Sequence, residues 1–531
     1  MKRNAFILVM LVSVASLAPI GCGCGCNTPI VEPARAIDLQ EITVRQLGRG
    51  YREGRFTVVE VVQGYLNRIE AVDRGGPRLN SVLCVNPDAL GIAAELDAEL
   101  EAGRARGPLH GIPVILKDNI DSSDPMPTTA GATALRDSFT RRDSAVARKL
   151  RQAGAVILAK ANLSEWANFR ASFSSSGWSG VGGQTRNPYV LDRNPCGSSS
   201  GSGVAVSANL CALAIGTETN GSIVCPATSN GIVGLKPTVG LVSRSGIIPI
   251  SFSQDTAGPM GRTVEDVAAC LGALAGIDEA DVMTLDPDGR HGDDYTAFLK
   301  ADGLRGKRIG WLKNLGGYHH RVDALLERAA ADLRQQGAEV VELEGPKEGP
   351  IEDASFQVML YEFKDGLNRY FAGLGGAAPV KSVAELIEFN KKDPVELRHF
   401  DQKLLELAQE KGGLDAAEYR EALAAMRKAA REEGIDKLMG EHRLDALMGP
   451  TGAPAWKTDR IDGDHFLGGS SSLAAIAGYP SITVPMGFVD ELPVGVSFFG
   501  RAWSEPVLIE IAYAYERATR HRRPPRFLAS D

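Results

Sequence analysis

The sequence lacks a surplus of positive charge. It carries 58 lysine and arginine residues against 66 aspartate and glutamate residues, which gives a formal net charge of −8. A protein that binds nucleic acid usually presents a basic face to the phosphates. We therefore expect no nucleic-acid partner, although an acidic surplus by itself identifies no substrate.

Motifs for metals and nucleotides are also missing. There is no HExxH sequence, no cysteine and histidine pattern with the spacing of a metal site, and no GxxxxGK[ST] loop for phosphates. The sequence therefore predicts neither a metal nor a cofactor.

Cysteine is scarce, with eight residues in a chain of 531, and three of them lie close together at 22, 24 and 26. The other five include no CxxC pair, and so few in so long a chain do not form a disulfide scaffold. We expect most of them to be buried as small apolar side chains. These five are Cys84, Cys196, Cys211, Cys225 and Cys270.

The apolar run near the N-terminus is too short for a membrane span. It covers residues 5–18 and follows Lys2 and Arg3, a pattern typical of a secretory signal. Cys22 follows a small residue, as in lipoprotein processing, although Pro19 stands where an aliphatic residue is usual. We expect a signal over 1–26 and export to the periplasm, the cell envelope or the medium. Lipid attachment at Cys22 and an uncleaved N-terminal anchor remain alternatives.

The rest of the chain alternates between helical and strand patterns. Residues 57–72 have apolar positions at helical spacing, and residues 112–116 form an apolar run typical of a buried strand. Similar alternation continues over 143–169, where we expect a helix to start within 162–169, and it indicates α/β layering. The charge-rich residues 350–442 are mainly helical in pattern and predict an insert.

A stretch rich in serine and glycine, 195–226, offers a first candidate nucleophile. Residues 197–201 satisfy the G-x-S-x-G pattern of a nucleophile elbow, which would make Ser199 the nucleophile. That motif requires a buried strand just before it, whereas residues 185–195 contain two prolines. No histidine lies in a clearly structured polar motif downstream, so the pattern does not favour an elbow.

Lys117 offers a second starting point, because it directly follows the apolar run at 112–116. Most lysines are solvated surface charges. A buried strand, however, would draw this amine into an apolar site, where the charged form is disfavoured and the pKa falls. Such a lysine can act as a base.

Three segments occur in order along the chain: GIPVILKDN at 111–119, GSSSGS at 197–202 and GTETNGSI at 216–223. With this order they resemble the amidase signature family. The likeness spans about 40–520, and three framework segments continue it. These are 234–238, 255–260 and 478–485.

The resemblance implies a fold and a catalytic triad. The fold is a central mixed sheet covered by helices on both faces, an α/β/α arrangement, here expected over 38–525 with the helical insert at 350–442. Ser222 corresponds to the nucleophile, Ser198 to a bridging serine in a cis peptide, and Lys117 to the base. A serine hydroxyl needs such a neighbour to remove its proton before it attacks a carbonyl.

The resemblance also implies a site for the oxyanion, formed by backbone N–H groups just before the nucleophile. Asn168 is a candidate for binding substrate, because an amide both donates and accepts hydrogen bonds. It could equally be a surface residue of a helix. The backbone donors map to Thr219, Asn220 and Gly221.

The chain departs from the wider family at two positions. Many members have Gly-Gly-Ser-Ile-Arg around the nucleophile, whereas this chain has Asn220 before Gly221 and Val224 in place of the arginine. We expect Asn220 to affect substrate polarity or rate without removing the nucleophile.

Within the family, the segments 162–170 and 183–188 resemble those of bacterial peptide amidases. This implies hydrolysis of the C-terminal amide of peptides with release of ammonia, by a monomer that acts on a small or peptide amide. One alternative is an A-type subunit of a glutamine amidotransferase, which the N-terminus and the acidic charge disfavour. The other is an inactive envelope lipoprotein that binds amides.

Overall fold

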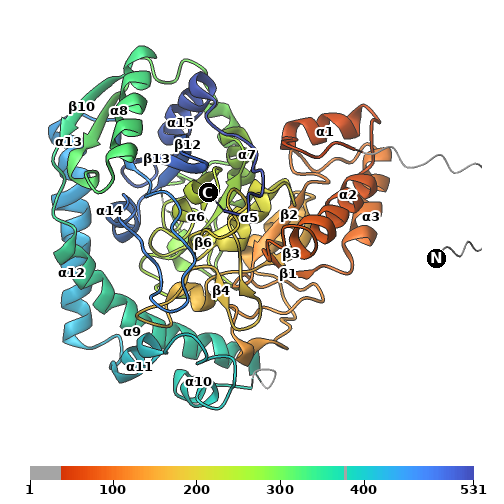
Figure 1. Ribbon diagram of the computed structural model, residues 1–531, viewed down its shortest axis with the longest axis horizontal. Helices are drawn as coiled ribbons and strands as arrows, with labels where there is room; N and C mark the ends of the chain where they lie inside the picture. Colours follow the sequence, from red (N-terminus) through yellow and green to blue (C-terminus); the bar gives the residue numbers. More distant parts are fainter. Residues whose placement is uncertain (1–36, 287, 376–378, 531) are drawn as a thin grey trace, which may run out of the picture. The chain divides into compact units, whose positions relative to one another are not determined.

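A computed structural model describes residues 37–286, 288–375 and 379–530 (Figure 1). Its centre is an eleven-stranded sheet in the order β1-β3-β2-β6-β8-β7-β12-β13-β11-β9-β10. The sheet is mixed, since β2 pairs in parallel with β3 and β6, while β6 pairs antiparallel with β8. The predicted α/β fold with a mixed sheet is therefore confirmed. The strands are β1 (Val82–Val85), β2 (Pro113–Lys117), β3 (Val156–Ala161), β6 (Leu213–Glu218), β7 (Val233–Lys236), β8 (Thr256–Gly261), β9 (Arg308–Leu312), β10 (Glu339–Leu343), β11 (Ala446–Pro450), β12 (Ser481–Val489) and β13 (Leu492–Phe499).

The parallel strands β2 and β6 are buried along their whole length. Strands buried on both faces are built from continuous apolar runs, which explains the run that precedes Lys117. Val114 pairs with Leu213 and Leu116 with Ile215. Since the two strands run in the same direction, their carboxyl ends meet at one edge of the sheet.

Two short helices follow the candidate catalytic residues. α5 (Ser200–Ser207) and α6 (Val224–Ser229) are buried throughout and consist mostly of small residues. In α5, a Cβ added at Gly201 would lie 2.3 Å from the carbonyl oxygen of Ser81 and 2.5 Å from that of Asn162. Glycine is required there because the backbones approach so closely.

Longer helices pack against the sheet and against one another. α2 (Val58–Arg68) begins at a capping box formed by Thr57 and Glu60. In the described residues, no helix is long and apolar enough to cross a membrane. The helices that contact the strands include α3 (Ala89–Glu101), α4 (Ala145–Gln152), α7 (Val264–Leu274), α8 (His320–Gln335) and α15 (Glu505–Thr519), and α2 (Val58–Arg68) packs on α3.

The segment expected to form a helical insert contains five α-helices, which border the sheet in Figure 1. Phe363 and Phe371 of α9 belong to a buried cluster with Trp166, Ile248 and Ile250, which lie in loops beside the sheet. These helices are α9 (Gly349–Leu374), α10 (Val383–Asn390), α11 (Lys403–Glu410), α12 (Ala417–Ala430) and α13 (Asp436–Glu441).

Two local expectations are wrong. Residues 162–169 do not start an α-helix, because Trp166, Ala167 and Asn168 have φ angles of 50°, 54° and 71°. This left-handed backbone costs roughly 1–2 kcal/mol per residue, so tertiary contacts must hold it. Cys196 and Cys225 are not separate apolar side chains but form a disulfide.

We predict that Gly201→Ala destabilises the protein by about 1–3 kcal/mol, because the added methyl group would overlap backbone atoms that cannot easily move. Thermal unfolding measures the loss. Gly91→Ala is the matched control, since a Cβ at this exposed position of α3 has no neighbour within 4 Å. Equal melting temperatures for the two variants would contradict the prediction.

Candidate active site

Lys117 lies at the carboxyl end of β2 with no exposed surface. Its Nζ donates to Ser198 Oγ at 2.7 Å, to Thr217 Oγ1 at 2.8 Å and to the Thr217 carbonyl oxygen at 3.2 Å. The structure therefore brings two of the three predicted catalytic side chains, Lys117 and Ser198, into direct contact.

Burial lowers the pKa of Lys117 to about 7, while the carboxylates of Asp255 and Glu218 act in the opposite direction. The charged ammonium is disfavoured because it has exchanged water for a largely apolar environment. Near neutral pH a large share of the amine is thus unprotonated. An amine in this state can accept a proton from the Ser198 hydroxyl.

Ser198 is fully buried, and the Gly197–Ser198 peptide bond is cis. The Ser198 carbonyl oxygen accepts a hydrogen bond from the Ser164 N–H at 3.1 Å. A Cβ at Gly197 would lie 2.2 Å from Ser164 Oγ, so a side chain at position 197 would displace this loop.

Ser222 lies just before α6 and is 8% exposed. Its carbonyl oxygen accepts from the Ser199 N–H at 3.2 Å, which places the two serine-bearing loops side by side. The Glu218 carboxylate accepts from the N–H groups of Ile223 and Val224 and fixes the turn that carries Ser222. Among the hydrogen bonds of the described residues, none involves the Ser222 hydroxyl, so the structure does not itself join Ser222 to Ser198.

The loop at 219–221 presents unpaired backbone donors beside Ser222. Within the part of the chain that the structure describes, none of its three N–H groups donates a hydrogen bond. Gly221 has a φ of 79°, a conformation that glycine adopts without strain. Donors left free next to a candidate nucleophile are suited to an oxyanion. They belong to Thr219, Asn220 and Gly221.

The side chains in this loop are held from outside it. The Thr219 hydroxyl donates to Asp255 at 2.5 Å. Asn220 accepts from Ser471 Oγ at 2.7 Å and donates to Ser472 Oγ at 3.2 Å, at the start of α14 (Ser472–Ala477). The departure at Asn220 thus links the candidate oxyanion loop to α14.

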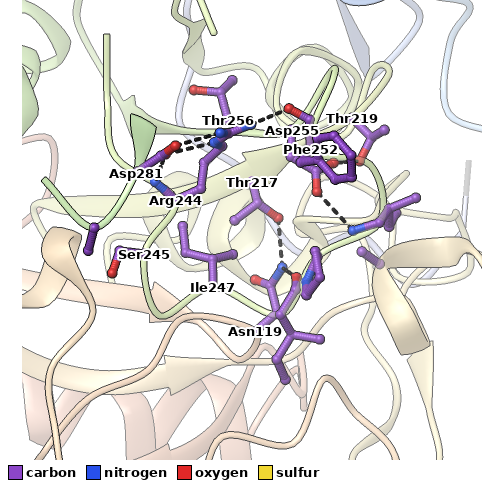
Figure 2. Close-up of a pocket in the computed structure, with 15 residues that line it drawn as sticks. Asn119, Thr217, Thr219, Arg244, Ser245, Ile247, Phe252, Asp255, Thr256 and Asp281 are labelled. Atoms are coloured by element: carbon purple, nitrogen blue, oxygen red, sulfur yellow. Dashed lines mark hydrogen bonds and ion pairs between the residues drawn. The ribbon is translucent and has the colours of Figure 1, made fainter. Parts of the chain in front are cut away.

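Thr217 and Asn119 line a cavity of about 190 Å³ (Figure 2). Thr217 connects this wall to the buried amine, since its Oγ1 accepts from both Lys117 Nζ and Asn119 Nδ2. Arg244 and Asp281 form an ion pair in the wall, with 2.6 Å between Arg244 Nη2 and Asp281 Oδ1. The apolar part of the wall consists of Ala167, Ile247, Ile248, Pro249, Ile250, Phe252 and Ala280.

A carboxylate from the helical segment positions part of this wall. Glu362 of α9 is fully buried and accepts hydrogen bonds from Ser251 Oγ at 2.6 Å and from the Ser253 N–H at 3.0 Å. It also accepts from the Tyr419 hydroxyl of α12 at 2.7 Å. The loop at 250–253 is therefore held partly by a residue more than 100 positions away and partly by Asp255, which accepts from the Ile250 and Ser251 N–H groups.

Asn168, the predicted substrate-binding residue, is exposed and accepts from Ser174 Oγ at 3.2 Å. Its neighbour Ala167 lines the cavity, whereas Asn168 is not among the lining residues. In the described residues, no group of three or more His, Cys, Asp or Glu side chains could hold a metal ion.

Sequence reasoning missed several residues that shape the site. Thr217 and Asp255 lie inside the motif segments 216–223 and 255–260, and this position in the motifs could have identified them as site residues. Asn119 likewise follows Lys117 by two residues. Ser471 and Glu362 gave no local signal, because their contacts depend on the tertiary fold.

We predict that the reactivity of Ser222 rises with pH and is half-maximal near pH 7, because the neutral form of Lys117 is the base and its fraction grows as pH passes the pKa. The measurement is the rate at which a fluorophosphonate probe labels the protein between pH 5 and 10, with Ser222→Ala as the background control. A midpoint near pH 10, typical of a solvated lysine, would contradict the assignment.

Comparison with known proteins places the chain in a family. The Amidase family model matches residues 60–509. Native peptide amidase from Stenotrophomonas maltophilia has a solved structure with 55% sequence identity and a TM-score of 0.89, covering 92% of this chain and 99% of that chain.

Curated relatives indicate the same family. A probable amidase of Arabidopsis thaliana is 39% identical over 98% of both chains. The A-type subunit of the glutamyl-tRNA(Gln) amidotransferase of Symbiobacterium thermophilum is 36% identical over 90% of this chain and 97% of that protein. The chain therefore belongs to the amidase family and is a hydrolase that acts on amides.

Proposed function

We propose that the protein removes the C-terminal amide of peptides through an acyl-enzyme formed on Ser222. The observation that carries this proposal is the buried Lys117 amine, 2.7 Å from Ser198 Oγ and close to the loop that bears Ser222. A lysine in this protonation state and position is suited to activate a serine.

In the proposed reaction, Ser222 Oγ attacks the amide carbonyl while its proton passes to Ser198, whose own proton passes to Lys117. The negative oxygen of the tetrahedral intermediate accepts from the free N–H groups of 219–221. Lys117 then returns its proton through Ser198 to the leaving nitrogen, the C–N bond breaks and ammonia departs. Water attacks the acyl-enzyme along the same proton path and releases the carboxylic acid.

Two features support a peptide carboxamide as the substrate. One is the 55% identity with a peptide amidase over 92% of this chain. The other is the cavity lined by Thr217 and Asn119, since its apolar wall suits the side chain of an amino-acid residue next to the amide. Asn168, which is exposed and follows the lining residue Ala167, is the proposed partner for the peptide backbone.

The amidotransferase alternative has less support. The identity with the A-type component of such an enzyme is 36%, against 55% with the peptide amidase. An inactive amide-binding lipoprotein would have no use for an amine whose pKa has been lowered to about 7.

We predict that the purified protein releases ammonia from amidated dipeptides. Ser222→Ala should lower the rate at least about a thousandfold, and Lys117→Ala about a hundredfold or more, because they remove the nucleophile and its base. Ser123→Ala, at an exposed serine, is the matched control. Labelling of Ser222 without ammonia release from any amidated dipeptide would refute the peptide specificity.

We also propose that residues 1–26 direct export, with Cys22 as a candidate lipid site. These residues lie outside the described part of the structure. The disulfide between Cys196 and Cys225 supports the proposal, since such bonds persist mainly in oxidising compartments.

The expected outcome in the native host is a protein found in the envelope or medium, with a mass that lacks the N-terminal segment. Cell fractionation and mass spectrometry of the intact chain provide the measurement, and a chain beginning at residue 27 should stay in the cytoplasm. A full-length mass in the cytosolic fraction would contradict export.

A further inference from the structure

The disulfide joins the two loops that carry the serines. Cys196 precedes Ser198 by two residues, and Cys225 follows Ser222 by three. The two cysteine Cα atoms are 6.0 Å apart, and the cysteines are 29 positions apart in sequence. No other covalent bond in the described residues links these loops except the chain itself.

Hydrogen bonds also join the segments that carry the two serines. The Ser199 N–H donates to the Ser222 carbonyl oxygen at 3.2 Å, and Asn230 Nδ2 donates to the Pro195 carbonyl oxygen at 2.9 Å. Ser199 Oγ donates to the Thr217 carbonyl oxygen at 3.1 Å and accepts from the Thr217 N–H at 3.2 Å. A single hydrogen bond contributes little net free energy and permits small displacements. The disulfide restricts such displacements more strongly.

The bond is also covered. Trp456 packs with both cysteines, which are only 5% and 8% exposed. Trp456 Nε1 donates to Asp464 at 3.0 Å, and Asn194 Nδ2 donates to the same carboxylate at 3.3 Å. Asn194 in turn accepts from the Cys196 N–H at 2.8 Å. The cover and the disulfide thus form one unit next to the Ser198 loop.

We propose that the Cys196–Cys225 disulfide is a positioning element of the active site, which holds the Ser198 and Ser222 loops at the separation that proton transfer requires. This inference rests on the proposed function of the two serines. Transfer between hydroxyls needs a separation of about 2.6–3.2 Å. A shift of about 1 Å can cost about a hundredfold in rate.

The cavity proposed to bind substrate is built chiefly from other parts of the chain, such as 244–252 and Asn119, and Thr219 is its one lining residue from the 219–222 loop. Loss of the disulfide should therefore slow acylation and leave substrate binding largely intact. If the disulfide only stabilised the fold, its loss would lower the melting temperature without changing the turnover of the folded enzyme. The two roles can therefore be distinguished.

The test compares the full-length protein with Cys196→Ala/Cys225→Ala, far below the melting temperature of either. Active sites are counted with the fluorophosphonate probe, and kcat and KM are measured on an amidated dipeptide. We expect kcat per active site to fall about 10- to 100-fold, with KM within about twofold. Cys84→Ala removes a cysteine that is not in a disulfide and should change neither constant.

A second measurement uses the unaltered chain. A dithiol reductant converts the disulfide to two thiols and becomes a cyclic disulfide itself, so two electrons and two protons enter the protein. The labelling rate should fall on reduction and return on reoxidation, and the double variant should not respond. Mass spectrometry after alkylation verifies the redox state.

Three results would overturn the proposal. The first is a double variant with an unchanged kcat and a lower melting temperature. The second is a double variant whose kcat/KM falls only because KM rises. The third is unfolding of both the double variant and the reduced wild type. If the oxidised protein is labelled but releases no ammonia, the proposed peptide specificity fails, whereas the labelling rates still decide the question of the disulfide.

Discussion

The burial of one amine determines much of this structure. Lys117 can be neutral near pH 7 only because the sheet removes its amine from water. Its hydrogen bonds to Ser198 and Thr217 fix the orientation of the amine. Two parallel strands, β2 and β6, deliver the amine and the Thr217 oxygens to the same edge of the sheet, and the loop before α5 supplies Ser198. An exposed lysine at this position would retain its proton and could not accept one from a serine.

The surrounding loops are held by side-chain contacts and a disulfide, some of them local and some from distant parts of the chain. Glu218 binds the turn at Ser222, Ser471 binds Asn220, and the disulfide joins the two serine loops. None of these loops has the regular hydrogen bonding of a helix or strand. Their conformations therefore depend on side-chain contacts, as is usual where function requires unusual backbone geometry.

The sequence predicted the fold class and the contact between Lys117 and Ser198 through a buried apolar run and three ordered motifs. These signals depend on residues that are close together in sequence, so they can be recognised from the sequence alone. The sequence did not predict the left-handed turn at 166–168 or the pairing of Cys196 with Cys225. Helical propensity favoured a helix at the former, and tertiary contacts overrode it. Cysteine spacing alone could not indicate that two cysteines 29 positions apart meet in the fold.

Glu362 shows how substrate preference and chemistry are separated in this molecule. The carboxylate comes from the helical segment, yet it fixes the loop at 250–253 that forms part of the cavity wall. The helices α9 and α12 can accumulate substitutions that reshape the wall through Glu362 and Tyr419, while Lys117, Ser198 and Ser222 stay as they are. Changes in this segment can therefore let descendants of one enzyme diverge in substrate. A library of variants confined to α9 and α12 can do the same in the laboratory.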